Sequence, residues 1–419
     1  MDVSTVTIPD ERMTVSCPPE AYESDYSRPP SFYHRDSSVN NDEVYVRQYP
    51  ERAGETDSGR RSHSGSQEGC STVVEEDEDQ QLEEQEADQF GFLLKQSDTN
   101  GTILRRTPLE LNKLRRREKK WIQMFENWRF FMDNKFDKIR DRCRKGIPPA
   151  IRGKAWKYLC GAVYHMEVSN NRHVFERCLR GEVDPKWADD IDKDLNRQFP
   201  EHEMFARNGK FGENGREDLA TLLRCWTVLY PEEGYCQGQA PVASVLLMHM
   251  PLRDAFYCFV QICVRYLPNY YSAGLEAVQV DGDILQTLLK DKSRSTYSHL
   301  KKHGVDPVLY MIEWFMCIFC RTLPWPTVLR VWDMFFCEGV KVLFKVALVI
   351  MKNTISTKEQ CKQYPDLHAI VTRLKNLSPS ITDEETLVQK VCEVSLDDSE
   401  MEKLHFRALK LRQMRMKQK

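Results

Sequence analysis

Apolar positions divide the 419-residue chain into parts with different patterns. Residues 1–90 show almost no apolar periodicity and are rich in Ser, Pro, Glu, Asp and Gly, so they cannot bury enough surface to offset the loss of chain entropy. We expect this part to be disordered, and it ends in an acidic tract at residues 75–88. From residue 139 to residue 352, by contrast, strongly apolar blocks are separated by proline and glycine.

The blocks between residues 139 and 352 have helical spacing. They run for about ten to twenty residues between breaks, and hardly any stretch alternates apolar and polar positions with period two. This pattern predicts an all-α, multi-helical domain with more than about ten helices. Because no period of about 20 to 50 residues recurs, a helical solenoid is not expected.

Basic helices are expected on both sides of this domain. Residues 91–138 comprise a linker and an amphipathic helix that contains the basic run 113–120, with an apolar face formed by Leu114, Trp121, Phe125 and Trp128. Residues 353–419 form a helical extension whose basic tail, 403–419, carries one stripe of Leu404, Ala408 and Leu411. Each basic segment is compatible with a solvated helix face or with peripheral contact to an anionic membrane, and the tail also with a partner helix.

Composition and charge restrict the classes of function. A formal net charge of −3 provides no field over the whole protein that would attract nucleic acid, so no nucleic-acid partner is expected. The first residues lack the basic and apolar regions of a signal peptide, and no apolar stretch reaches the roughly 20 residues that cross a bilayer. We therefore expect a cytoplasmic protein, peripheral at most on endomembranes or the plasma membrane, whose 14 cysteines are free thiols.

A metal or thiol enzyme is the alternative that the cysteines suggest. Cys317 and Cys320 form a CxxC pair, but they lie in MIEWFMCIFC, which reads as an apolar helix. A structural zinc site needs four ligands, and no second pair of ligands is nearby. No metal site is therefore expected.

Three short patterns in the helical region carry the candidate chemistry. In the first, Pro148 and Pro149 mark a helix start, and Arg152 and Trp156 follow on one helical face. This spacing suits an arginine packed along an aromatic core residue, so we assign Arg152 and Trp156 a structural role.

The second pattern, IDKDLNRQFP, places Asp194 three residues before Arg197, with Pro200 ending the helix. A carboxylate at this spacing can hold the guanidinium in one rotamer, and a fixed guanidinium is a donor fork for phosphate. Taken alone, the pattern equally describes an ordinary intrahelical ion pair.

In the third pattern, EEGYCQGQAP, Gly234 and Gly238 bracket Tyr235 and Gln237 before a strongly apolar helix. Glycine permits a tight turn, so the Gln237 amide should project outward at a helix start. A carboxamide can accept a hydrogen bond from an attacking water while donating one to a phosphate oxygen, although a helix-capping glutamine fits the pattern too.

Arg197 and Gln237 are informative together because the chain has no GxxxxGK[ST] phosphate-binding loop. Phosphoryl transfer needs positive charge near the bridging oxygens and an oriented water. The chain has candidates for both, so the nucleotide must come with a partner.

The three patterns, in this order, resemble the signature motifs of the TBC domain, the Rab GTPase-activating module. The segments GFLL, DPKW, LPNYYSAGLEA and DPVLY are similar to the EPI/Whacked-type TBC subfamily. The resemblance covers about half of the chain. It implies a domain of two helical subdomains that uses an arginine finger and a glutamine finger, roles that fall on Arg197 and Gln237, with Asp194, Tyr235 and Gly238 in support.

The resemblance also implies the partner, a Rab-family GTPase in its GTP form. That partner carries GTP and Mg²⁺, so no cofactor is expected in this chain. One departure is that Gln239 and Ala240 follow the QG dipeptide, where the family often has Met-Asn. A catalytically weak Rab-binding adaptor is the alternative function, and intact Arg197 and Gln237 count against it.

Overall fold

The structure is a computed structural model that describes residues 86–94, 107–167 and 171–417. All of them belong to one compact unit. Within these ranges the fold is all-α, as predicted, and the extended contacts are two isolated bridges that join Ala87 to Leu93 and Phe92 to His202. Most of the segment predicted to be disordered lies outside the described residues.

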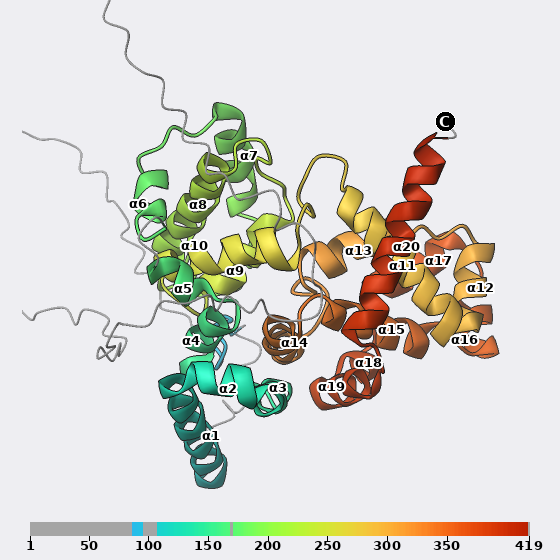
Figure 1. Ribbon diagram of the computed structural model, residues 1–419, viewed down its shortest axis with the longest axis horizontal. Helices are drawn as coiled ribbons and strands as arrows, with labels where there is room; N and C mark the ends of the chain where they lie inside the picture. Colours follow the sequence, from blue (N-terminus) through green and yellow to red (C-terminus); the bar gives the residue numbers. More distant parts are fainter. Residues whose placement is uncertain (1–85, 95–106, 168–170, 418–419) are drawn as a thin grey trace, which may run out of the picture. The chain divides into compact units, whose positions relative to one another are not determined.

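The described helices follow one another closely along the chain (Figure 1). Their bounds are α1 (Pro108–Glu126), α2 (Trp128–Asn134), α3 (Phe136–Arg144), α4 (Pro149–Leu159), α5 (Ala162–Glu167), α6 (Val174–Cys178), α7 (Pro185–Leu195), α8 (Gly212–Leu229), α9 (Gln239–Leu247), α10 (Leu252–Gln261), α11 (Glu276–Lys292), α12 (Arg294–Lys302), α13 (Val308–Met311), α14 (Trp325–Glu338), α15 (Lys341–Thr354), α16 (Lys358–Gln363), α17 (Leu367–Lys375), α18 (Pro379–Thr382), α19 (Glu384–Glu393) and α20 (Asp398–Lys417). Two π-helical segments, η3 (Ile262–Tyr266) and η4 (Ile312–Met316), extend α10 and α13.

The packing forms two groups of helices. In the first, α8 contacts α6, α7, α9 and α10, and every residue of α9 is buried. In the second, α11, α17, α18 and α19 contact the apolar helix α15, and α13 contacts α11 and α17. Helix α14 joins the groups because it contacts α4, which packs on α10 of the first group, as well as α15 and α19 of the second.

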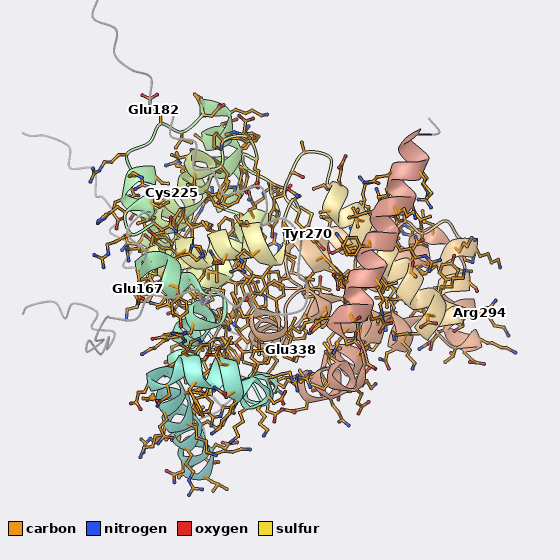
Figure 2. The ribbon with its side chains drawn as sticks, in the orientation of Figure 1. Glu167, Glu182, Cys225, Tyr270, Arg294 and Glu338 are labelled. Atoms are coloured by element: carbon orange, nitrogen blue, oxygen red, sulfur yellow. The ribbon has the colours of Figure 1, made fainter. Side chains whose placement is uncertain are left out.

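Buried polar contacts hold α14 against the start of the domain. Asp333, fully buried on α14, accepts hydrogen bonds from the Arg152 Nε at 3.1 Å, the Trp156 Nε1 at 2.8 Å and the Ile147 backbone N–H at 2.6 Å. Arg152 and Trp156 are thus both buried on α4, and they share Asp333 as a hydrogen-bond acceptor. A second pair, Arg144 with Glu338, makes two hydrogen bonds of 2.7 and 2.6 Å near the end of α14 (Figure 2).

The last helix, α20, packs along α11 (Figure 1). Met401 and Ala408 of α20 are buried, and the Arg412 Nε donates to the Asp283 carboxylate of α11 at 2.8 Å. The predicted stripe is only partly correct, because Leu411 is 44% exposed. The helix turns Arg412 toward α11 instead, where the ion pair with Asp283 replaces an apolar contact.

The segment 86–94, which spans the predicted boundary at residue 90, packs on the domain. The Asp88 carboxylate accepts hydrogen bonds from the backbone N–H groups of Phe90 and Phe92, at 2.8 and 3.0 Å, which closes a turn. The Phe92 ring then packs edge-on against His202 and Trp325. The apolar residues after the acidic tract are therefore anchored on the domain. No helix in the described residues is long and apolar enough to cross a membrane.

Candidate functional site

Arg197 lies in the turn that follows α7. Its guanidinium forms an ion pair with the Asp194 carboxylate, and the Arg197 backbone N–H donates to the Asp194 carbonyl at 3.1 Å. The exposure of the two partners differs sharply, since the Asp194 side chain is 5% exposed and the Arg197 side chain is 56% exposed. A buried carboxylate therefore holds one edge of a guanidinium that is otherwise open to a partner.

Helix α7, which carries Asp194, ends earlier than predicted, at Leu195 rather than at Pro200. The side chain of Gln198 donates from Nε2 to the Asp194 carbonyl at 3.0 Å and so caps the last turn. Phe199 then has a φ of 41°, in the left-handed region that is costly for a bulky residue. These two features turn the chain away from the helix axis and leave Arg197 on a bend.

Gln237 lies in the turn immediately before α9. Its side chain is exposed and makes no hydrogen bond within the described residues, so the amide is available to a partner. The preceding turn is closed by Gln239, whose Oε1 accepts from the Cys236 backbone N–H at 2.9 Å. The sequence prediction of an outward amide at a helix start agrees with this geometry, and the side chain that closes the turn is that of Gln239 rather than that of Gln237.

A hydrogen bond joins the arginine turn to the glutamine turn. The Tyr235 hydroxyl donates to the second carboxylate oxygen of Asp194 at 2.8 Å, while the first oxygen contacts Arg197. Burial raises the pKa of Tyr235 well above its ordinary value, so the phenol remains a donor. Gly234, with a φ of 63°, lets the same loop pack against the Trp187 indole on α7. Asp194 thus sets the position of both turns, a connection that the sequence patterns did not reveal.

The segment 316–321 borders both turns. Gly238 faces Met316, and a Cβ built on this glycine would lie 3.2 Å from the Met316 methyl group, so the close approach favours glycine. The Tyr271 hydroxyl donates to the Met316 carbonyl at 2.8 Å. On the other side, the guanidinium of Arg321 donates to the Arg197 carbonyl at 3.3 Å. Neither Met316 nor Arg321 stood out in the sequence.

The CxxC pair does not lie in a helix, contrary to the prediction. Cys317 and Cys320 occupy a turn after η4, because the backbone enters the left-handed region at Ile318 and Phe319. Both thiols are buried, and burial raises the pKa of Cys317 to about 12 and raises the pKa of Cys320 well above its ordinary value. Such thiols are poor nucleophiles and poor metal ligands at neutral pH. Among the described residues, no group of three or more His, Cys, Asp or Glu side chains could hold a metal ion.

The sequence of this chain is similar to those of known proteins of one family. A model of the family "Rab-GTPase-TBC domain" matches residues 149–358. The chain is 48% identical over 322 residues to mouse TBC1 domain family member 10A, an alignment that covers 77% of this chain and 63% of that protein. It is 42% identical over 308 residues to the TBC1 domain family member whacked of Drosophila melanogaster, covering 73% of this chain and 84% of that protein.

A solved structure supports the fold. The Chlamydomonas flagellar RabGAP TBC domain superposes with a TM-score of 0.55 at 21% identity, covering 74% of this chain and all of that one. The chain spans less than two thirds of the length of the mouse relative. These relatives confirm the resemblance to the EPI/Whacked-type TBC subfamily that the motifs indicated. The chain belongs to the Rab-GTPase-TBC domain family.

Proposed function

We propose that this protein is a GTPase-activating protein for Rab-family GTPases, with Arg197 as an arginine finger and Gln237 as a glutamine finger. The observation that carries the proposal is the Asp194 carboxylate, which contacts Arg197 with one oxygen and Tyr235 with the other. The two exposed side chains are therefore presented by turns that share one buried anchor. The family membership supports the same reading.

Arg197 supplies the charge that phosphoryl transfer needs. As the γ-phosphoryl group separates from GDP, negative charge builds up on the transferred group and the bridging oxygen. A guanidinium fixed before the reaction stabilises that charge without reorganising. One edge of Arg197 is held by Asp194, and the exposed remainder reaches the nucleotide of the bound GTPase.

Gln237 orients the attacking water. Its carbonyl oxygen accepts a hydrogen bond from the water while its NH₂ group donates to a phosphate oxygen, so both reactants are held in line. Because the side chain makes no internal hydrogen bond within the described residues, no contact must be broken to do this. GTP and Mg²⁺ belong to the Rab partner. Faster hydrolysis switches the Rab off and so regulates vesicle trafficking.

The test is a single-turnover assay of GTP hydrolysis with purified protein and a panel of Rab GTPases in their GTP form. The proposal predicts that at least one Rab hydrolyses GTP faster in the presence of the protein. Binding to GTP-loaded Rabs with no acceleration on any of them would favour the alternative, a catalytically weak Rab-binding adaptor.

A second proposal concerns the membrane. The basic run 113–120 borders a cavity of about 510 Å³ that contains neither finger. Lys113 and Lys145 are exposed at this cavity, and burial together with the Arg330 guanidinium lowers the pKa of Arg117. Lys113 and Lys145 carry exposed positive charge at this cavity, whereas Arg152 and Arg330 are buried in ion pairs with acidic side chains. These exposed lysines suit peripheral contact with anionic lipid, to which the exposed basic residues of 403–415 would add.

Vesicle flotation tests the membrane contact. The protein should float with vesicles that contain phosphatidylserine and not with neutral vesicles, and Lys113→Glu with Lys145→Glu should reduce the floated fraction. Lys302→Glu with Lys358→Glu, on α12 and α16, makes the same charge change away from the cavity. Equal loss in both double variants would attribute binding to net charge rather than to this site.

A further inference from the structure

The backbone beside the arginine finger is strained in two places. Phe199 has a φ of 41°, and Ile318 and Phe319 have φ values of 48° and 58° in succession. This region is unfavourable for a β-branched or aromatic residue, and such a backbone conformation persists only where the surrounding structure enforces it. Strain of this kind is concentrated at functional sites, so the contacts that enforce it are informative.

Buried groups hold the strained turn 317–320 in place. The Trp332 Nε1 donates to the Ile318 carbonyl at 3.0 Å, and the Phe319 backbone N–H donates to the Trp314 carbonyl at 2.7 Å. Ile318 and Phe319 are both fully buried. The turn is therefore a rigid part of the core, and it fixes the backbone position of the next residue, Arg321, at the protein surface.

Arg321 connects this rigid turn to the finger. Its guanidinium donates to the Arg197 carbonyl at 3.3 Å and lies 5.9 Å from the centre of the Phe199 ring. Phe199 is itself nearly buried and packs edge-on against Trp325, with ring centres 5.6 Å apart. Asp194 holds the side chain of Arg197, whereas Arg321 holds its backbone.

The same segment reaches the glutamine turn. Met316, at the end of η4, lies against Gly238, and the Met316 carbonyl accepts the hydrogen bond from Tyr271. The residues from Met316 to Arg321 therefore contact both finger-bearing turns from one rigid support. Any shift of this support changes the separation between Arg197 and Gln237.

From this arrangement we infer that Arg321 is a positioning residue for the arginine finger. The inference rests on the proposed function. Arg321 acts through the Arg197 backbone, by keeping the bend after α7 in the one conformation that aims the guanidinium at the nucleotide. A displacement of about 1 Å in a catalytic group is enough to reduce the rate strongly. Loss of Arg321 therefore lowers kcat and leaves the affinity for the GTPase almost unchanged.

The chain offers a matched control in Arg373. Its guanidinium also donates to a backbone carbonyl, that of Asn376 at 3.2 Å, and lies 5.9 Å from the centre of an aromatic ring, that of Tyr364. Both arginines thus make the same two contacts, but Arg373 lies on α17, and neither of its contacts involves a finger turn. Replacing it removes equivalent interactions without touching the site.

The experiment measures kcat and KM for a responsive Rab with the full-length parent and with Arg321→Ala, Arg321→Lys and Arg373→Ala. We expect Arg321→Ala to lower kcat about tenfold with KM within about twofold, Arg321→Lys to recover part of the loss, and Arg373→Ala to match the parent. A raised KM with unchanged kcat would overturn the inference, because Arg321 would then contact the GTPase directly. Parent-like kinetics of Arg321→Ala would overturn it as well.

Hydrogen exchange provides a readout that needs no GTPase activity. Backbone amides of a peptide spanning Asn196 to Phe199 should exchange faster in Arg321→Ala than in the parent. Their exchange rate in Arg373→Ala should equal that in the parent. Equal exchange in all three proteins would overturn the positioning role. If the parent accelerated no Rab at all, the proposed function would fail, and the exchange measurement would still decide whether Arg321 holds the bend.

Discussion

Asp194 contacts two side chains with different roles: Tyr235 stabilises the fold, and Arg197 is available for catalysis. Tyr235 is 8% exposed, and its hydroxyl donates to the Asp194 carboxylate at 2.8 Å. Removing this hydroxyl in Tyr235→Phe leaves the ring volume intact and deletes a hydrogen bond to a buried charged group, which costs about 1.5–3 kcal/mol. The Arg197 side chain is 56% exposed, so solvent screens its ion pair, and Arg197→Ala costs about 0–1 kcal/mol.

These magnitudes predict opposite rankings for stability and activity. In urea unfolding, Tyr235→Phe should lower the free energy of unfolding by more than Arg197→Ala does, with similar m-values. In the hydrolysis assay, Arg197→Ala should lose far more activity than Tyr235→Phe, because Asp194 still contacts the arginine when the tyrosine hydroxyl is gone. The reasoning is refuted if Arg197→Ala destabilises the protein as much as Tyr235→Phe, since the ion pair would then be a structural contact.

Three further predictions concern the structure that supports the site. Arg152→Ala leaves the buried Asp333 carboxylate without a cation and should lower the free energy of unfolding by about 3–5 kcal/mol in urea, whereas a loss under about 1 kcal/mol would contradict the burial of this charge. Burial raises the pKa of Asp281 to about 7, so between about pH 4 and pH 7 the folded state retains a proton that the unfolded chain releases. The free energy of unfolding should therefore fall as pH rises through this window, by about 1.4 kcal/mol per pH unit. Asp281→Asn should flatten that slope. Gly234→Ala would place a Cβ against the Trp187 indole at a positive φ and should cost about 1–3 kcal/mol while also lowering GTPase activation, and a parent-like protein would show that the loop tolerates displacement.

Local patterns predicted the features that depend on neighbouring residues. Helical periodicity gave the all-α fold, the Pro148–Pro149 pair marked the start of α4, and the glycines around Gln237 indicated an exposed turn before α9. Each depends on interactions within a few residues of the chain. For the same reason Asp194 could be paired with Arg197, three positions away.

The remaining features depend on contacts between distant parts of the chain. Asp333 reaches Arg152 across 181 positions, and Tyr235 reaches Asp194 across 41, so no local spacing could reveal either hydrogen bond. The turn at Ile318 was predicted as helix because neither residue in the left-handed region is a glycine. Tertiary packing overrides local preference at this turn, and it does so beside the finger.

The central claim is that Arg197 and Gln237 act together on the GTP of a bound Rab. Its most direct test compares single-turnover GTP hydrolysis by a responsive Rab in the presence of the parent, Arg197→Ala, Gln237→Ala and the control Arg207→Ala, which replaces an exposed arginine outside the two turns. We predict that Arg197→Ala lowers the accelerated rate by roughly 10³ to 10⁵ and that Gln237→Ala is similarly damaging, with unfolding parameters close to those of the parent. If both variants accelerated hydrolysis as fast as the parent and Arg207→Ala on every responsive Rab, the assignment of the two fingers would be wrong.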